Sequence, residues 1–206
     1  MGKVGLVEGR LSGQVLACDF FVVVTATFRR LYVFVVIEHA SRRLMHVNVT
    51  AHPSAAWTLQ QIREVVADTD RHRFLIHDRD SIFAKALDDS VRALGLAILR
   101  SPFGSPKANA ICERVIGTMR RECLAWMIPI SEAHLRLILR EWVAHYSGGR
   151  PHSALGPGVP DPPTRSTHDR KLATRRPWAP GALVCANSVL SGLHHEYFLA
   201  AARVDA

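Results

Sequence analysis

Three acidic residues stand in places where a carboxylate is costly unless it is paired or bound to a metal ion. Asp19 interrupts a run of β-branched and aromatic residues, Asp78 follows a short apolar run, and Glu113 lies beside an apolar stripe of helical spacing. Taken singly, each has an ordinary explanation as a hydrogen-bonded strand residue, a turn residue or a solvated helix face. Together they form an oxygen-only ligand set of the kind that suits Mg²⁺ or Mn²⁺. We interpret them as a candidate metal site at one edge of a sheet.

Polar and basic residues accompany Glu113 along the sequence. Asn109, Glu113 and Arg120 follow one another at intervals of four and seven residues, so on a helix they share one face. Lys107 precedes them in a loop. A metal-binding carboxylate beside cations meets the needs of phosphodiester chemistry, because metal ions activate the nucleophile while cations hold phosphates. The alternative is that Arg120 and its neighbour Arg121 are ordinary surface charges.

The composition indicates a globular protein with a polyanionic partner. The 206 residues include 26 Lys and Arg against 18 Asp and Glu, for a net charge of +8, and 48% are hydrophobic, which excludes wholesale disorder. The excess of basic over acidic residues is densest in residues 100–150, which have 8 basic and 4 acidic side chains. A net positive charge of this size favours nucleic acid or an anionic membrane surface as the binding partner. The apolar stretch 20–37 is cut by Arg29 and Arg30, so neither half reaches the ~20 residues of a membrane helix.

The four cysteines show no CxxC spacing. We interpret them as reduced thiols of a cytosolic protein, and not as a disulfide or zinc framework. The start of the chain lacks the apolar core of a signal peptide.

Hydrophobic periodicity predicts a mixed α/β domain. An antiparallel meander of three strands precedes alternating helices and short strands, and two further helices follow. The long helix carries an apolar stripe from Cys112 to Trp126 and ends before Pro129, and the next helix begins after Ser131 and stops at Gly148. The earlier elements are expected as strands over 16–24, 31–37 and 43–50, a helix over 54–67, a strand over 74–76, a helix over 83–94 and a strand over 97–99.

Four ordered motifs resemble the integrase core, or DDE, domain of bacterial insertion-sequence transposases and retroviral-type integrases. The motifs are Leu-Ala-Cys-Asp-Phe-Phe at 16–21, Leu-Ile-His-Asp-Arg-Asp-Ser-Ile-Phe at 75–83, Ser-Pro-Lys-Ala-Asn-Ala-Ile-Cys-Glu-Arg at 105–114, and the segment from Glu141 through Gly149-Arg150-Pro151-His152-Ser153-Ala154-Leu155-Gly156. The match covers about residues 14–163, and Asp78 and Glu113 stand 35 positions apart, close to the family's spacing.

The resemblance implies a ribonuclease-H-like fold, a five-stranded mixed sheet flanked by helices. It implies that Asp19, Asp78 and Glu113 are catalytic and bind two Mg²⁺ or Mn²⁺ ions. It further implies DNA contacts from the polar and basic residues around the glutamate: Lys107, Asn109, Arg114, Arg120 and Arg121. The family often has glycine where this chain has Asp80, so Asp80 is the alternative metal ligand; we favour Asp78 because it directly ends the strand.

We expect a leader over 1–13, a catalytic core over 14–163 and a basic tail over 164–206, in which 182–188 and 197–199 could pair as a hairpin. The expected function is metal-dependent DNA cleavage and strand transfer in DNA integration and recombination. The alternatives are a ribonuclease-H-like nuclease that only hydrolyses DNA, and an inactive DNA-binding remnant of a decayed mobile element. The expected partners are the ends of the element, target DNA, further copies of the chain, and a separate helix-turn-helix protein encoded upstream. A cytoplasmic, nucleoid-associated location follows from these partners.

Overall fold

A five-stranded sheet carries the residues of the candidate site. The computed structural model describes residues 12–67, 71–78, 85–100, 109–156, 158–162 and 183–200. Strands β1, β2 and β3 pair in an antiparallel manner, while β4 lies parallel to β1 and β5 parallel to β4, in the order β3-β2-β1-β4-β5. This arrangement confirms the predicted mixed sheet. The bounds are β1 Val15–Val24, β2 Arg30–Glu38, β3 Leu44–Thr50, β4 Phe74–His77 and β5 Ala97–Arg100.

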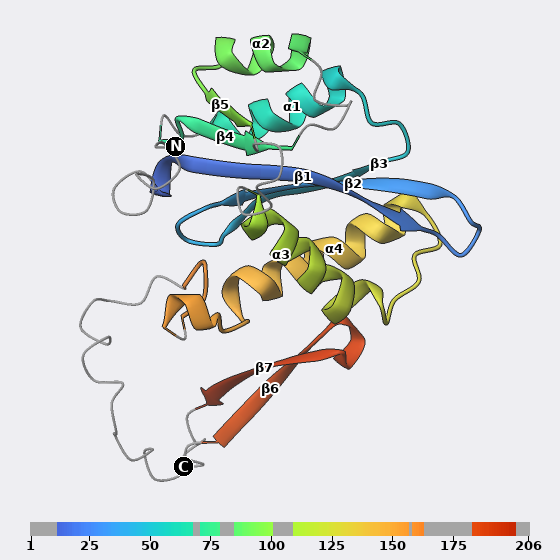
Figure 1. The fold of residues 1–206 in the computed structure, drawn as a ribbon. Coiled ribbons are helices and arrows are strands. Elements are labelled where there is room, and N and C mark those ends of the chain that lie inside the picture. The colour runs from blue at the N-terminus through green and yellow to red at the C-terminus, as the bar shows by residue number, and fades with distance from the viewer. Residues whose placement is uncertain are drawn as a thin grey trace. The chain divides into compact units, whose positions relative to one another are not determined.

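Two pairs of helices cover the two faces of the sheet (Figure 1). On one face lie α1 (Ala55–Val66) and α2 (Lys85–Ala93), and on the other lie α3 (Ala110–Met119) and α4 (Glu132–Gly148). Helix α1 begins where the Ser54 hydroxyl accepts a hydrogen bond from the Trp57 N–H at 3.2 Å, as an N-cap residue does. Alternation along β1 sends Leu16 and Cys18 into the core beneath α1 and α2. The full cluster of buried residues in that core is Leu16, Cys18, Phe34, Val36, Ile62, Val65, Leu75, Leu87, Val91 and Leu96.

Helix α3 ends differently from the sequence prediction. The α-helix stops at Met119 and a π-helical turn, η2 (Arg120–Leu124), follows, in which the Ala125 N–H bonds to the Arg120 carbonyl at 2.8 Å. The prediction that Trp126 continues the buried stripe is wrong, because its side chain is 71% exposed. A π turn closes its hydrogen bond over five residues instead of four, so residues beyond it rotate away from the stripe.

The contacts divide the chain into two compact units, residues 1–143 and 144–206. Within the second unit, β6 (Leu183–Val189) and β7 (His194–Ala200) form an antiparallel hairpin. The Glu196 carboxylate of this hairpin lies 2.8 Å from Nδ1 of His145, and the His145 and His194 rings stack at 4.9 Å. The hairpin expected in the tail is therefore present, whereas the expected boundary near residue 163 stays a prediction.

None of the helices within the described residues is long and apolar enough to cross a membrane. All four cysteines are free, and Cys18, Cys112 and Cys123 are buried.

Candidate active site

Parallel pairing of β1 with β4 brings Asp19 and Asp78 to the same edge of the sheet. The last paired residues of the two strands are Ala17 and Ile76, and each aspartate lies two residues beyond its strand's member of that pair. Since side chains alternate between the faces of a sheet, Asp19 and Asp78 lie on the face opposite to Cys18 and His77. Asp19 is half-buried and Asp78 is exposed, so both carboxylates have access to solvent.

Helix α3 brings Glu113 to this same face. Its buried side, Cys112, Val115, Ile116 and Met119, faces the sheet, and α3 contacts both β1 and β2. Asn109, at the start of the helix, donates a hydrogen bond from Nδ2 to the Cys18 carbonyl at 3.2 Å. This bond ties the first turn of α3 to the residue before Asp19. Glu113 lies one turn further on, with its side chain exposed.

Two buried thiols are influenced by the predicted acidic residues. Burial raises the pKa of Cys18 well above its usual value, and the charges of Asp19 and Asp78 raise it further. Burial likewise raises the pKa of Cys112, with contributions from Asp19, Cys18 and Glu113. Asp19 therefore acts on both thiols, Asp78 on one and Glu113 on the other. Each of the three predicted site residues therefore raises the pKa of at least one of the two thiols.

The donor set suits a hard divalent cation. Its oxygens are carboxylates, which Mg²⁺ and Mn²⁺ prefer, and the raised thiol pKa values keep Cys18 and Cys112 protonated, which makes them poor ligands. Asn109 adds a buried Oδ1 atom that has no hydrogen-bond partner within the described part of the chain. In the described residues no group of three His, Cys, Asp or Glu side chains is already close enough together to hold a metal ion.

Arg120 lies beside the strand that carries Asp19. Its guanidinium sits over the Phe21 ring, 5.3 Å from the ring centroid, and Phe21 follows Asp19 by two residues on the same face of β1. Arg121 folds back over Gly117, where an added Cβ would approach its guanidinium to 3.1 Å. Arg114 is exposed on α3. Three of the predicted DNA-binding arginines therefore lie on α3 and on the π-helical turn that follows it.

The roles of three predicted site residues stay predictions. Asn109 is only 3% exposed, and its role toward DNA stays a prediction. Lys107 and Asp80 lie outside the described residues. A residue that the sequence reasoning missed is Asp88 of α2, whose Oδ1 lies 3.1 Å from Nε2 of the buried His77. This pair fixes the end of β4 directly before Asp78, and its only signal in the sequence is an acidic residue on the buried side of an otherwise polar helix.

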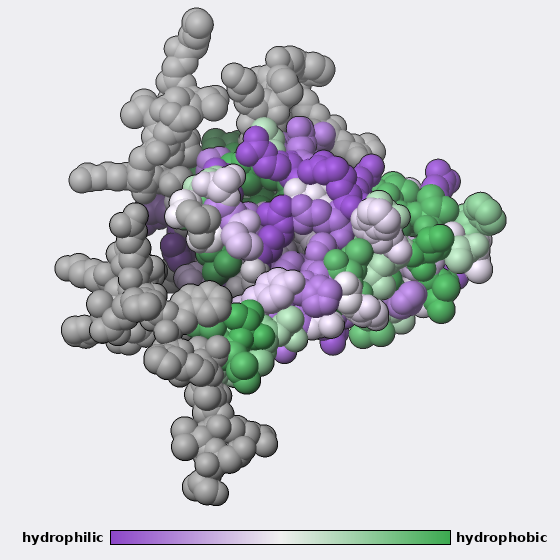
Figure 2. All heavy atoms as spheres, turned by 90° about the horizontal axis from the view of Figure 1, so that it is seen from below, coloured by the Kyte–Doolittle hydropathy of each residue, from purple (hydrophilic) through white to green (hydrophobic). Residues whose placement is uncertain are grey.

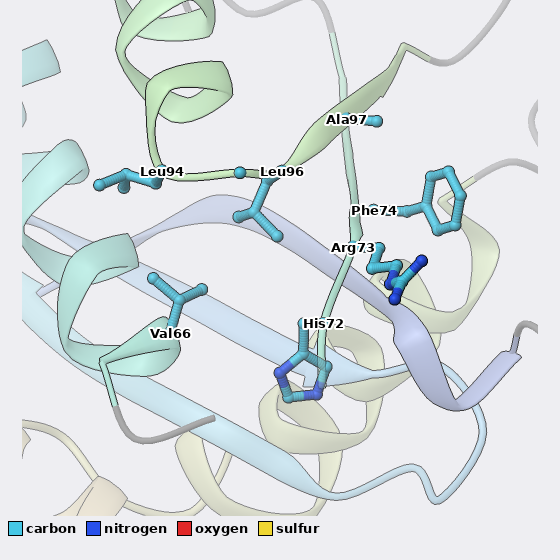
Figure 3. Close-up of a pocket in the computed structure, with 8 residues that line it drawn as sticks. Val66, His72, Arg73, Phe74, Leu94, Leu96 and Ala97 are labelled. Carbon is cyan, nitrogen blue, oxygen red and sulfur yellow. The ribbon is translucent and has the colours of Figure 1, made fainter. Parts of the chain in front are cut away.

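A cavity lies at the other end of the parallel strands (Figure 3). It has a volume of about 500 Å³ and is bounded by the residues that begin β4 and β5, Phe74 and Ala97. Figure 3 shows Leu94, Leu96 and Val66 forming an apolar wall opposite His72 and Arg73. Since Asp78 follows the carboxyl end of β4, this cavity is separate from the acidic edge.

The sequence of residues 94–160 matches the family model described as integrase core domain. The insertion element IS407 uncharacterized 31.7 kDa protein of Burkholderia multivorans is 26% identical over 145 residues, which are 69% of this chain and 52% of that protein. The insertion element IS476 uncharacterized 39.2 kDa protein of Xanthomonas euvesicatoria is 24% identical over 154 residues, 73% of this chain and 44% of that protein. The chain thus spans about half the length of these curated relatives.

Solved structures share the fold. The catalytic core domain of BIV integrase superposes with a TM-score of 0.53 at 16% identity, covering 72% of this chain and 91% of that one. The catalytic domain of Mos1 mariner transposase superposes with a TM-score of 0.57 at 16% identity, covering 68% and 74%. Further Mos1 catalytic-domain structures were solved with Mg and with Mn. These matches confirm both the ribonuclease-H-like fold and the resemblance to the integrase core that the sequence motifs carry.

Proposed function

We propose that this chain is the catalytic core of a DDE transposase or integrase that cleaves and joins DNA. The observation that supports the proposal most strongly is the convergence of Asp19, Asp78 and Glu113 from two parallel strands and one helix. Besides burial, Asp19 and Asp78 raise the pKa of the Cys18 thiol, and Asp19 and Glu113 raise the pKa of the Cys112 thiol. The match of residues 94–160 to the integrase core domain adds independent support from sequence.

Asp19, Asp78 and Glu113 would hold the two divalent ions, Mg²⁺ or Mn²⁺. When bound, the ions activate the attacking oxygen and stabilise the leaving oxygen. The chain's own residues position these ligands. The Phe20 N–H donates to Oδ1 of Asp19 at 2.7 Å, and the Asn109 amide fixes α3 on β1 beside it. The bond between His77 and Asp88 holds the end of β4. Aligned reactants and preorganised charge then supply most of the catalysis.

The basic side chains hold the DNA backbone at this site. Arg114, Arg120 and Arg121 are exposed along α3 and η2, and Lys107 and Asn109 precede them in the sequence. Water attacks a phosphodiester at the end of the element, the bond to the leaving oxygen breaks, and a 3′-hydroxyl is freed. That hydroxyl then attacks a target phosphodiester in line. No covalent bond between protein and DNA forms, so no Ser or Tyr nucleophile is proposed.

The proposed partners are the element ends, target DNA and further copies of this chain. Among the solved relatives, an STLV intasome and a dimeric HTLV-2 integrase core give examples of assemblies. A separate helix-turn-helix protein encoded upstream is proposed to supply sequence recognition, and the location is proposed to be the bacterial cytoplasm.

A joining assay tests the function. The full chain is mixed with labelled DNA carrying the inverted repeats that flank its coding region, a supercoiled plasmid, and Mg²⁺, Mn²⁺ or EDTA. We expect label joined to plasmid in either metal, with no product in EDTA or with Glu113→Gln. Shortened strands without joined product would instead indicate a nuclease that only hydrolyses. Binding without any cleavage would indicate a DNA-binding remnant.

A further inference from the structure

A polar pair, His77 and Asp88, is buried between β4 and α2. Alternation along β4 turns His77 to the same face as Leu75, which belongs to the core under α1 and α2. The side chains of the pair are only 2% and 1% exposed. Figure 1 places α2 across the sheet from α3, and Figure 2, a view of the side on which α3 and α4 lie, shows hydrophilic residues across its middle. The pair therefore reaches β4 from the side opposite to the exposed Glu113.

The His77 ring contacts two oxygen atoms, one through each of its nitrogens. Nε2 lies 3.1 Å from Oδ1 of Asp88, and Nδ1 is hydrogen-bonded to the backbone carbonyl of Asp78. A carbonyl oxygen can only accept a hydrogen bond, so Nδ1 carries a proton and donates it. The hydrogen bond at one nitrogen of an imidazole sets the tautomer and the orientation of the ring. Asp88 therefore holds the His77 ring in the orientation that reaches the Asp78 carbonyl.

The bonded carbonyl belongs to a residue that lies just beyond the sheet. Pairing of β4 with β1 ends at Ile76, and pairing with β5 ends at His77. Asp78 follows directly, and its side chain is exposed to solvent. The bond from the ring tethers the Asp78 backbone at the point where the ladders end. The direction in which the Asp78 carboxylate leaves the sheet then depends on the ring.

The pair stands in an apolar setting. The other buried residues of α2 are Leu87 and Val91, and both are apolar. Replacing both members of a buried polar pair by apolar side chains of similar shape is often neutral for stability. Two leucines could fill this space beneath α2, but they could not hold the Asp78 carbonyl. The property that sets the polar pair apart from an apolar one is therefore its hold on Asp78.

We propose that His77 and Asp88 are positioning residues for the metal site. Asp88 orients the His77 ring, and the ring fixes the Asp78 backbone so that its carboxylate stays in place for a divalent ion. The inference rests on the proposed function and adds to it a control of metal affinity from α2, outside the three acidic residues. Neither side chain is itself a metal ligand. Residues that orient ligands in this way typically change metal affinity by about 10–100-fold.

The test compares the affinity of the full chain for Mn²⁺, by titration calorimetry, with its stability, by urea unfolding. Asp88→Leu leaves Nε2 of His77 without this partner, so we expect Mn²⁺ to bind at least about 10-fold more weakly and unfolding to occur at lower urea. The double variant His77→Leu, Asp88→Leu removes both polar groups. We expect its urea midpoint to return toward that of the original chain while Mn²⁺ binding stays weak. Recovery of Mn²⁺ affinity together with stability would overturn the proposal.

Asp88→Asn is the conservative variant. Its amide can donate to Nε2 of His77 while Nδ1 keeps its proton for the Asp78 carbonyl, so we expect most of the Mn²⁺ affinity to remain. Asp89→Asn, which changes the exposed carboxylate next to Asp88 on α2, is the matched control and should bind Mn²⁺ as the original chain does. A loss of Mn²⁺ affinity in Asp88→Asn as large as that in Asp88→Leu would contradict the orienting role.

Hydrogen exchange of backbone amides in EDTA gives a readout that needs no metal and no cleavage. We expect the amides around Asp78 to exchange several-fold faster in the double variant than in the original chain, because the tether on the Asp78 carbonyl is lost. This result in a chain that joins no DNA would leave the positioning role standing without the proposed function. Unchanged exchange, or unchanged Mn²⁺ binding by the double variant of a chain that joins DNA, would reject this inference alone.

Discussion

Asp78 and Asp80 compete for one role at the end of β4. Asp78 is favoured because it lies at the same level as Asp19 in the parallel register and acts on the Cys18 thiol. We predict that Asp78→Asn lowers strand transfer by at least about 100-fold, as the loss of a central electrostatic contact does, while Asp80→Asn keeps most of the activity. The measurement is the amount of labelled DNA that becomes joined to the plasmid. Asp89→Asn, on the exposed side of α2, is the control, and an active Asp78→Asn with an inactive Asp80→Asn would assign the role to Asp80.

Glu38 makes stability depend on pH. Burial acts to raise the pKa of this carboxyl, but hydrogen bonds from Ser41 and His72 and the charge of Arg71 outweigh it, so the pKa is lowered from 4.5. A lowered pKa stabilises the fold above the pKa of the unfolded chain, and this contribution is lost as the pH falls through the folded value. We predict that Glu38→Gln lowers the free energy of unfolding by about 1–3 kcal/mol at pH 7, with a smaller difference toward pH 3.

Urea unfolding at several pH values between 3 and 7 measures this difference. Glu64→Gln, which changes an exposed carboxylate on α1, should leave stability nearly unchanged throughout. A deficit for Glu38→Gln that stays constant down to pH 3 would contradict the assigned cause.

At the scale of elements, α4 protects the edge strand of the sheet. β3 is the last strand in the sheet order, and Arg136 of α4 donates to the Val49 carbonyl at 2.6 Å and to Oδ1 of Asn48 at 3.1 Å. We predict that Arg136→Met, which keeps an apolar stem, lowers the free energy of unfolding by about 1–3 kcal/mol. Arg140→Met on the same helix should cost less than about 0.5 kcal/mol. Urea unfolding measures both variants. Equal losses of unfolding free energy would show that the contacts of Arg136 with β3 add nothing to stability.

Most helices and strands could be predicted, because the spacing of the hydrophobic residues along the chain differs between the two. The run from Leu16 to Val24 is too short and too rich in β-branched residues for a helix, and the alternation along it also places Asp19 on the face that α3 covers. The end of α3 could not be predicted, because the π turn depends on hydrogen bonding that leaves no trace in hydropathy. The burial of Asn109 could not be predicted either, since its partner Cys18 is 91 residues away.

At the scale of the whole molecule, the basic excess falls around the helix that carries Glu113, one of the three predicted acidic site residues. The densest positive charge, in residues 100–150, includes the exposed arginines of α3 and η2 that follow Glu113. One continuous segment therefore presents Glu113 and these arginines, whereas Asp19 and Asp78 come from β1 and the end of β4. The chain spans about half the length of its curated relatives.

Titration calorimetry with Mn²⁺ tests the central claim most directly. The full chain should bind about two ions, the number that two-metal phosphodiester chemistry requires. Asp19→Asn, Asp78→Asn and Glu113→Gln should each lose this binding while their circular dichroism stays that of the original chain. Retention of the original Mn²⁺ binding by all three variants would contradict the account.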